Sequence, residues 1–327
     1  MNPLIDPTGR RVDYLRISVT DRCNERCLYC MTENHAGWLP RAGILSDAEF
    51  IAIVQAAVSL GFTRFRITGG EPLLRVGVVD LIGRIVALPG VESVMLTTNG
   101  VFLPALAQPL YDAGLRRINV SLDALNAATY RAITGGDVEP VLRGIDLLRE
   151  IGFPSVKLNT VLMRGKNEAE ILPLLHFAAR RDIAIRFIEL MPVSSIEMLK
   201  DTIFLPIGEV QARLQQQDEL IPLDDRLGFG PAKYFRLPKL GATVGLIGAM
   251  SDLHFCDRCN KMRLTCDGKL RPCLGNHMET DLMPALRPAV DPSVLQRLFL
   301  DTLAEKPEEH SFRHQFVPLR GMTAIGG

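Results

Sequence analysis

Short apolar runs alternate with amphipathic stretches from Tyr14 to Met191. The runs are rich in β-branched and aromatic residues, which favour strands, so we predict strands at 14–20, 62–68, 91–98, 115–121, 155–161 and 183–190. Apolar positions at helical spacing predict helices at 46–61, 78–88, 142–152 and 168–181. The first of these helices begins with the Ser46 and Glu49 pair of a capping box and ends at Gly61.

Six strand–helix units imply parallel strands joined by right-handed crossovers. Either an open doubly wound sheet or a curved, incomplete barrel fits this pattern, since about eight units are needed to close a full barrel. After Met191 the alternation stops, and Gly, Pro and charged residues interrupt 192–232. Strand-like pieces follow at 233–237 and 242–248, then a cysteine-rich loop and a helix near 293–305. We expect this part to form a smaller second region.

The predicted strands end in small, polar and glycine-rich residues, as in "TDRCNERC", "TGGEP", "TTNG" and "SLDA". In parallel α/β folds the chemistry gathers at the carboxyl ends of the strands. The whole set of ends therefore predicts a ligand spread over that edge of the sheet.

The composition indicates which kinds of partner the protein binds and in which cell compartment it acts. Lys+Arg and Asp+Glu number 37 each, and this zero net charge argues against nucleic-acid or membrane binding but leaves room for a local basic pocket. We find no signal peptide at the N-terminus and no apolar run long enough to span a membrane. We therefore expect a cytoplasmic protein, in which clustered cysteines are metal ligands or catalytic thiols rather than disulfides.

Cys23, Cys27 and Cys30 form a Cys-x3-Cys-x2-Cys cluster after the first predicted strand. Three thiolates at this spacing suit a [4Fe–4S] cluster with one iron left open to a substrate group. A fragment of a zinc knuckle, or buried free thiols, is the alternative. The cluster, with Tyr29 before its last cysteine and "GGEP" at 69–72, resembles the radical S-adenosylmethionine (SAM) superfamily.

A second cluster contains Cys256, Cys259 and Cys273, with Cys266 between them. A zinc ribbon would use Cys266 as its fourth ligand, whereas a second [4Fe–4S] cluster with an open iron would leave it out.

The order of motifs along nearly the whole chain resembles the GTP 3′,8-cyclases of molybdenum cofactor biosynthesis. These motifs include "LRISVTDRCNERCLYCM", "RITGGEPLLR", "INVSLD", "RFIELM", "CNKMRLTCDGKL" and the final "IGG". The resemblance implies an α/β fold, an incomplete (βα)6 TIM-type barrel, with a smaller C-terminal region that carries a second Fe–S cluster. We place the radical SAM core at 5–220 and that region at 221–327.

The resemblance also implies roles for individual residues. Two [4Fe–4S] clusters are expected, the first on Cys23, Cys27 and Cys30 and the auxiliary one on Cys256, Cys259 and Cys273, with Cys266 not a ligand. The expected contacts with S-adenosyl-L-methionine are Tyr29, Gly70, Ser121 and Met191. Those with GTP are Arg16, Arg66, Thr97, Lys157, Lys261, Met262 and Arg263. The expected catalytic residues are Arg16, Lys261, Arg263, Gly326 and Gly327. The two glycines end the C-terminal tail, which reaches into the active site in this family.

The implied reaction converts GTP to (8S)-3′,8-cyclo-7,8-dihydroguanosine 5′-triphosphate, the first step of molybdenum cofactor biosynthesis. A 5′-deoxyadenosyl radical takes hydrogen from the ribose C3′, and the sugar radical attacks guanine C8. The expected partners are a reductant protein and the downstream cyclic pyranopterin monophosphate synthase, and the expected oligomeric state is a monomer or a homodimer.

One departure from the family concerns Lys261, which stands where the family usually has arginine. A lysine cannot give the planar two-pronged contact of a guanidinium, so GTP binding is expected to differ here. The rival interpretations are a peptide-modifying radical SAM enzyme and an iron–sulfur or zinc protein that carries electrons or binds a partner.

Overall fold

The computed structural model describes residues 4–31, 37–223, 227–314 and 316–326. Its strands join in a 12-stranded sheet of order β12-β11-β10-β1-β2-β3-β4-β5-β6-β9-β8-β7. The first six strands are β1 (Tyr14–Ser18), β2 (Arg64–Thr68), β3 (Ser93–Thr98), β4 (Arg117–Ser121), β5 (Ser155–Leu162) and β6 (Ala184–Glu189). They are parallel neighbours in that order, which confirms all six predicted strands.

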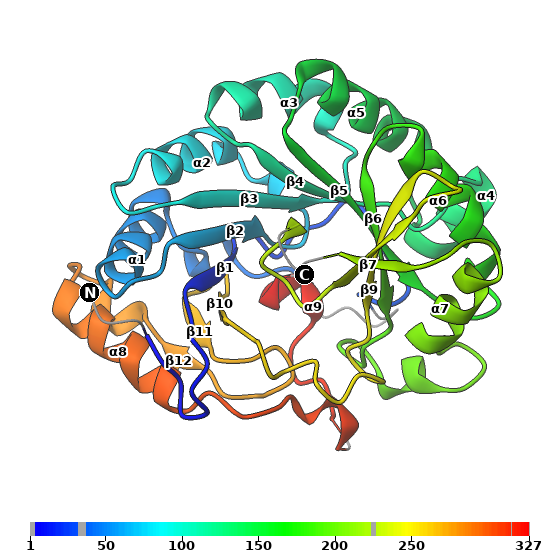
Figure 1. Ribbon diagram of the computed structural model, residues 1–327. Coiled ribbons are helices and arrows are strands. Elements are labelled where there is room, and N and C mark those ends of the chain that lie inside the picture. The colour runs from blue at the N-terminus through cyan, green and yellow to red at the C-terminus, as the bar shows by residue number, and fades with distance from the viewer. Residues whose placement is uncertain (1–3, 32–36, 224–226, 315, 327) are drawn as a thin grey trace.

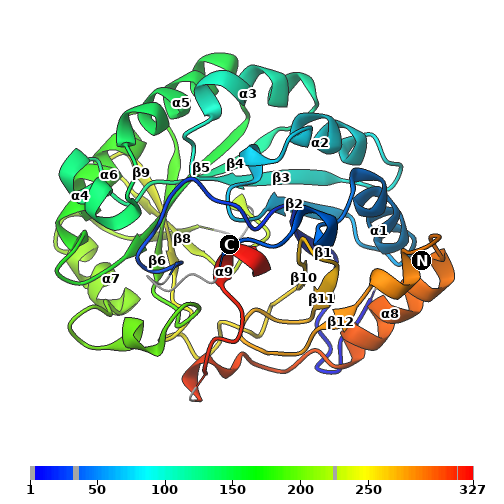
Figure 2. The ribbon, with the colours of Figure 1, turned by 180° about the vertical axis from the view of Figure 1, so that it is seen from behind.

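The helices lie on the outer face of the curved sheet (Figures 1 and 2). They are α1 (Asp47–Ser59), α2 (Val78–Val86), α3 (Leu103–Asp112), α4 (Ala127–Thr134), α5 (Val138–Ile151), α6 (Ile171–Ala179), α7 (Ile207–Gln215) and α8 (Pro292–Ala304). The short α9 (Met322–Ile325) at the C-terminus lies inside the barrel instead. Because α1 to α6, which connect the strands from β1 to β6, lie on one face only, the sheet is an incomplete barrel and not a doubly wound sheet.

Helix α1 begins as its sequence predicts. Ser46 accepts from the backbone of Glu49 at 3.3 Å, and Glu49 accepts from the backbone of Ser46 at 2.7 Å, so the capping box is complete. Phe50, Ile53 and other apolar residues of the helix are buried in the core. Within the described part of the chain, 41–59 is the one helical segment long and apolar enough to span a membrane, and this burial identifies it as a core helix.

The C-terminal part of the chain extends the same sheet on both sides. It contributes β7 (Ile221–Leu223), β8 (Lys233–Leu237), β9 (Ala242–Ile247), β10 (Lys261–Leu264), β11 (Lys269–Arg271) and β12 (Thr280–Asp281). Strand β9 pairs in parallel with β6, and β10 pairs in parallel with β1. The strands predicted at 233–237 and 242–248 are thus confirmed, while β10 and β11 lie in what we expected to be a loop.

Helix α7 lies within 192–232, where no helix was expected, and α3 and α4 were also missed. One hydrophobic core joins both parts of the chain, since it includes Leu15 of β1 together with Val244 of β9 and Phe299 of α8. The division at residues 220 and 221 stays a prediction.

Alternation along the strands separates the core from the inside of the barrel. In β1, Leu15 and Ile17 are fully buried in the core, whereas Tyr14 and Arg16 line an internal cavity. The same two-residue period turns Phe65 toward the helices and Arg66 toward the cavity. The strands therefore bring their alternate polar residues to one enclosed space.

Candidate active site

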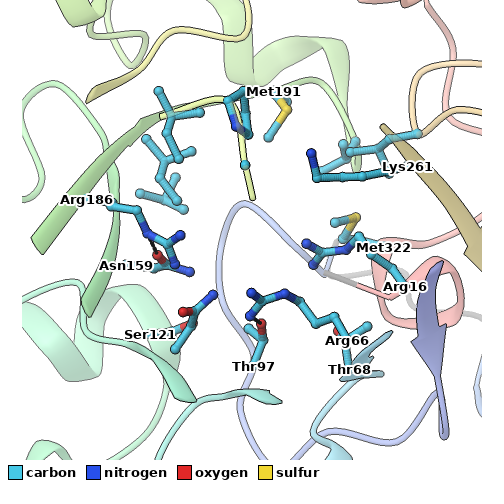
Figure 3. Close-up of a pocket in the computed structure, with 18 of the residues that line it drawn as sticks. Arg16, Arg66, Thr68, Thr97, Ser121, Asn159, Arg186, Met191, Lys261 and Met322 are labelled. Atoms are coloured by element: carbon cyan, nitrogen blue, oxygen red, sulfur yellow. Dashed lines mark hydrogen bonds between the residues drawn. The ribbon is translucent and has the colours of Figure 1, made fainter. Parts of the chain in front are cut away.

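The inside of the barrel contains a cavity of about 410 Å³, a size typical of a small-molecule site. Both cysteine clusters line it, together with residues from β1 to β6 and from β10. Figure 3 shows Arg16, Arg66, Thr97, Ser121, Met191 and Lys261 around this space. The structure thus brings together groups that lie more than half the chain apart in sequence.

The first cysteine loop follows β1 and lies at the carboxyl ends of the parallel strands. Its final turn is closed by hydrogen bonds from the backbone of Cys30 and Met31 to the carbonyl of Cys27, at 2.9 and 3.0 Å. Burial raises the pKa of Cys23 to about 11 and that of Cys30 to about 12. A metal cluster would have to displace these protons, because thiolates are the ligands.

The Gly-Gly-Glu-Pro turn after β2 is fitted against this loop. Gly70 donates its backbone N–H to Thr20 at 2.7 Å, and Glu71 donates to the carbonyl of Arg22 at 2.7 Å. A Cβ built on Gly70 would lie 2.3 Å from the carbonyl oxygen of Arg22. Only glycine allows so close an approach of two backbones, so the turn and the cysteine loop form one unit.

The Glu71 carboxylate fixes the turn to the end of β3. It accepts from the backbone of Leu73 at 3.0 Å, from the hydroxyl of Thr98 at 2.8 Å and from the backbone of Asn99 at 2.7 Å. Burial raises its pKa to about 7 despite these bonds. The glutamate of the motif is therefore a structural brace of the cavity wall.

Tyr29 is held by Asp123, which follows β4. The Tyr29 hydroxyl donates to Asp123 Oδ2 at 2.7 Å, and the backbone of Val161 donates to Asp123 Oδ1 at 2.9 Å. Tyr29 and Gly70, with the strand-end residues Ser121 and Met191, all line the cavity. The structure thus brings together the four residues expected to contact S-adenosylmethionine.

The second cysteine cluster lies at the opposite end of the barrel. Cys256 and Cys259 precede β10, which is parallel to β1, and Cys273 follows the antiparallel β11. All three cysteines therefore lie at the amino ends of the parallel strands and line the cavity. Cys266 is fully buried and is absent from the cavity lining, which supports the prediction that it is not a ligand.

The surroundings of the second set act differently on its three thiols, because burial raises the pKa of Cys256 and Cys273, whereas the pKa of Cys259 is lowered. Burial raises the pKa of Cys259, but the charges of Lys306 and Lys261 outweigh this effect and bring the value to about 7. Backbone N–H groups also act on two of the sulfurs, that of His310 on Cys256 and that of Lys261 on Cys259.

Both cysteine sets fit an iron–sulfur cluster by the chemistry of their donors. Among the described residues, no three His, Cys, Asp or Glu side chains are arranged around one metal ion. A [4Fe–4S] cluster does not need such convergence, because each thiolate binds a different iron atom.

Cationic side chains line the wall between the two cysteine sets. Arg16 of β1 lies directly between Arg263 of β10 and Arg66 of β2 in the register of the sheet. Arg66 donates to the hydroxyl of Thr97 at 3.0 Å, and Lys157 and Lys261 complete the predicted GTP-binding set in the cavity. This convergence is what a buried, highly charged anion requires.

The lowered pKa values of the basic side chains in this wall show that the cations lie close together. Burial and the charges of Arg186 and Arg117 lower the pKa of Lys157 to about 7, and burial lowers that of Arg263 to about 10. Burial and the charge of Arg263 also lower the pKa of Arg16 well below its usual value. Strongly perturbed groups that line one cavity are typical of a functional site.

Several polar cavity residues were missed by the sequence analysis, among them two arginines and an asparagine. Arg117 of β4 and Arg186 of β6 both point inward, and Arg186 donates to Asn159 of β5 at 2.8 Å (Figure 3). The signal was present, because each arginine alternates with buried apolar residues along its strand, Arg117 with Ile118 and Val120, and Arg186 with Ile185 and Phe187.

Met262 and Gly326 differ from the other predicted residues that the structure describes, which line the cavity. The side chain of Met262 is fully buried in the core and does not line the cavity, because it alternates with Lys261 and Arg263 along β10. The carbonyl of Gly326 accepts from Arg263 at 2.6 Å, so the C-terminal tail does enter the barrel. Gly327 lies outside the described residues.

A partial barrel whose carboxyl ends carry a Cys-x3-Cys-x2-Cys loop braced by a Gly-Gly-Glu-Pro turn defines a radical SAM protein. The model of the radical SAM superfamily matches residues 17–178, and that of Molybdenum Cofactor Synthesis C matches 183–312. The GTP 3′,8-cyclase of Pelotomaculum thermopropionicum is 42% identical over 98% of this chain and 99% of its own length. That of Pseudomonas putida is 46% identical over 99% of this chain and 98% of its own. The chain therefore belongs to the GTP 3′,8-cyclase family.

The solved structures show a more distant likeness. SuiB of Streptococcus suis, bound to its precursor peptide SuiA, matches with a TM-score of 0.61 and 14% identity over 91% of this chain and 65% of its own. This level of identity shows a shared fold alone. The full-length match to the cyclases, and not this fold, decides between a cyclase and a peptide-modifying enzyme.

Proposed function

We propose that this chain is a GTP 3′,8-cyclase that carries out the first step of molybdenum cofactor biosynthesis. The observation that carries the proposal is the order of groups along one cavity. A cysteine set lies at each end of the barrel, and a wall of buried cations lies between them. A binding or electron-carrier protein has no need of such an enclosed cationic space.

The cysteines and the residues around them would hold the cofactors. Cys23, Cys27 and Cys30 are suited to the first [4Fe–4S] cluster, with Tyr29, Gly70, Ser121 and Met191 around S-adenosylmethionine. Cys256, Cys259 and Cys273 are suited to the auxiliary cluster. When bound, the first cluster and S-adenosylmethionine supply a 5′-deoxyadenosyl radical, which takes a hydrogen atom from the ribose C3′ of GTP.

The cations would hold GTP between the two ends. Arg16, Arg66, Lys157, Lys261 and Arg263 offer charge-assisted hydrogen bonds to the triphosphate and the base, and Thr97 orients Arg66. Holding C3′ close to both the adenosyl carbon and guanine C8 makes the two bond changes intramolecular in effect, which is worth several orders of magnitude in rate. Met262 would act through the backbone of β10, since its side chain is buried in the core.

The tail would close the site. The Gly326 carbonyl fixes one end of the Arg263 guanidinium. A Cβ on Gly326 would lie 3.0 Å from the Cβ of Ser18 and 3.1 Å from Thr68 Cγ2, and its φ of +89° favours glycine. The tail therefore fits close to the ends of β1 and β2, where it would exclude water from the reacting groups.

Anaerobic reconstitution with iron and sulfide tests this function. With S-adenosylmethionine, dithionite and GTP present, we expect 5′-deoxyadenosine and cyclised GTP to rise in step. If 5′-deoxyadenosine forms while GTP is not consumed, radical chemistry is retained but GTP is not the substrate. If neither product forms with both clusters assembled, the proposal is wrong.

The same proposal includes the partner proteins, the cell compartment, the oligomeric state and the domain bounds. The last radical on the cyclised product must gain an electron, so a reductant protein is expected. The unstable product calls for a downstream cyclic pyranopterin monophosphate synthase. We expect the protein to act in the cytoplasm as a monomer or a homodimer, with a radical SAM core at 5–220 and the auxiliary-cluster region at 221–327.

A further inference from the structure

A buried lysine lies beside the second cysteine set. Lys306, which follows α8, is only 4% exposed. Its ammonium group donates to the carbonyl of Lys261 at 2.8 Å, to the carbonyl of Pro272 at 2.7 Å and to Cys259 Sγ at 3.5 Å. An ammonium has three N–H donors, and here each has an acceptor. A buried cation so fully satisfied has one fixed position.

These three acceptors belong to the two segments that carry Cys259 and Cys273. Lys261 lies two residues after Cys259, and Pro272 lies directly before Cys273. The Lys306 side chain therefore connects the start of β10 to the end of β11, in addition to its contact with a ligand sulfur.

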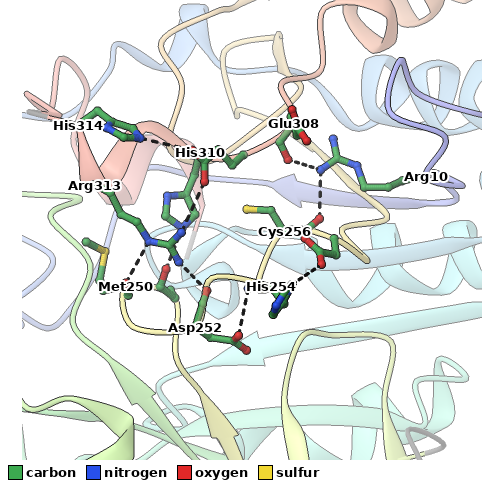
Figure 4. Close-up of polar contacts among 12 residues, drawn as sticks. Arg10, Met250, Asp252, His254, Cys256, Glu308, His310, Arg313 and His314 are labelled. Carbon is green, nitrogen blue, oxygen red and sulfur yellow. Dashed lines mark hydrogen bonds and ion pairs between the residues drawn. The ribbon is translucent and has the colours of Figure 1, made fainter.

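The third cysteine is linked to the same C-terminal segment by Arg10. Its guanidinium donates to the carbonyl of Cys256 at 3.1 Å, and to the carbonyls of Pro307 at 2.6 Å and Glu308 at 2.5 Å. An ion pair with Asp6 at 2.6 Å holds Arg10 in place. Figure 4 shows Arg10 between Cys256 and Glu308.

All three cysteines are thus fixed against residues 306–308 by two cations, Lys306 for Cys259 and Cys273 and Arg10 for Cys256. Only Lys306 reaches a ligand sulfur in the contacts described, and Arg10 acts on the backbone. The two cations therefore differ in what they can do to a bound cluster. Arg10 can position one ligand, whereas Lys306 can position two and also donates directly to a ligand sulfur.

We propose that Lys306 is a positioning residue for the auxiliary cluster, fixing the spacing of Cys259 and Cys273 and raising the reduction potential of the cluster. The inference rests on the proposed function, which places a [4Fe–4S] cluster on these cysteines. A hydrogen bond to a ligand sulfur and a nearby positive charge both stabilise the reduced, more negative state of a cluster. Loss of Lys306 should therefore make reduction harder and the ligand spacing less rigid.

The test compares Lys306→Met, which keeps the length of the side chain but removes its charge and donors, with Lys306→Arg, which keeps both. Lys239→Met, on the exposed turn between β8 and β9, is the matched control for loss of one lysine. Each variant is reconstituted anaerobically, its iron content is measured, and the auxiliary cluster is followed by a redox titration monitored by electron paramagnetic resonance. A Cys23→Ala, Cys27→Ala, Cys30→Ala background isolates the signal of that cluster.

We expect Lys306→Met to lose iron from the auxiliary cluster severalfold faster in a chelator challenge and to show a more negative midpoint potential. Lys306→Arg should recover much of both, and Lys239→Met should match the wild-type chain. An unchanged potential and unchanged iron loss in Lys306→Met would overturn the proposal. If Lys306→Met assembles no auxiliary cluster while its circular dichroism is native, the positioning role stands, and Lys306→Arg must then restore assembly.

The variant with Cys23→Ala, Cys27→Ala and Cys30→Ala but with Lys306 intact separates this proposal from the proposed function on which it rests. If it holds no [4Fe–4S] cluster on Cys256, Cys259 and Cys273, the proposed function fails before Lys306 is tested. If it holds one that Lys306→Met leaves unaltered, only the role of Lys306 fails.

Discussion

The C-terminal tail is held at its base by an ion pair that can be removed without changing the cavity wall. Arg320 donates to Asp267 through both of its terminal nitrogens, at 2.8 and 2.9 Å, and its Nε lies 3.2 Å from Glu279. The two side chains of the main pair are only 25% and 14% exposed. Six residues further on, Gly326 accepts from Arg263 inside the barrel. Arg320→Ala should therefore loosen the tail.

The size of the effect follows from the geometry of the pair. Exposed ion pairs contribute about 0.2–1 kcal/mol, and bidentate, charge-assisted pairs are about twice as strong. We therefore assign about 1–2 kcal/mol to the contact of Arg320 with Asp267. A loss of this size lowers the ratio of docked to undocked tail by about 5- to 30-fold. In the proposed function turnover needs the docked tail, so kcat for GTP cyclisation should fall with the docked fraction, by at most this factor.

The assay measures cyclised GTP under anaerobic conditions, together with amide hydrogen exchange of residues 321–326. Asp267→Asn should give a smaller loss of the same kind, and the double variant should be little worse than Arg320→Ala, because both remove one interaction. Arg84→Ala, on the exposed face of α2, is the control for loss of an arginine. Wild-type turnover and unchanged exchange in Arg320→Ala would refute the reasoning.

Four further predictions test individual parts of the site. Gly70→Ala should weaken S-adenosylmethionine binding by at least about tenfold, since its Cβ would lie 2.3 Å from the carbonyl of Arg22; an unchanged Kd would contradict this. Cys273→Ala should bind about four irons instead of about eight and form 5′-deoxyadenosine without cyclising GTP; loss of both products with the first cluster intact would argue against separate roles. Lys157, with a pKa of about 7, is charged below that pH, so the Kd for GTP should rise severalfold from pH 6 to 8, and this rise should be absent in Lys157→Met. Lys261→Arg should tighten GTP binding, measured as Kd, because a guanidinium can donate two parallel hydrogen bonds; weaker binding would show that the site is adapted to lysine.

The sequence predicts the barrel well where local patterning determines it. All six strands and α1 were found because alternation and the capping box are local signals. Helix α7 was missed because it is short and its apolar stripe, Ile207, Val210 and Leu214, contains only three residues among polar neighbours. Strand β10 was missed for a different reason: its Lys261 and Arg263 face a cavity instead of solvent, and its pairing with β1 and β11 makes it a strand.

The candidate site was predictable to a similar degree. The cysteines follow from their spacing, and most of the cavity-lining residues proposed to contact GTP follow from the resemblance, but Met262 could be placed in the core only by knowing which face of β10 is inward. Arg186 and Lys306 were not found. Arg186 was visible as a charge at an inward position of a strand, whereas Lys306 has no local signal, because its three acceptors lie 34 to 47 residues away in the chain.

Although the chain has zero net charge, acidic and basic side chains lie at different ends of the cavity. Carboxylates gather near the carboxyl ends of the strands, where burial raises the pKa of Glu25 to about 7 and that of Asp123 to about 6. Cations such as Arg16, Arg66 and Lys157 line the wall nearer the auxiliary cysteines. S-adenosylmethionine carries a sulfonium and an ammonium, while GTP carries a triphosphate, so in the proposed function each ligand would meet the opposite charge at a different end. The same arrangement would repel each ligand from the other's place, and we expect this to fix the orientation in which the adenosyl carbon and the ribose face each other.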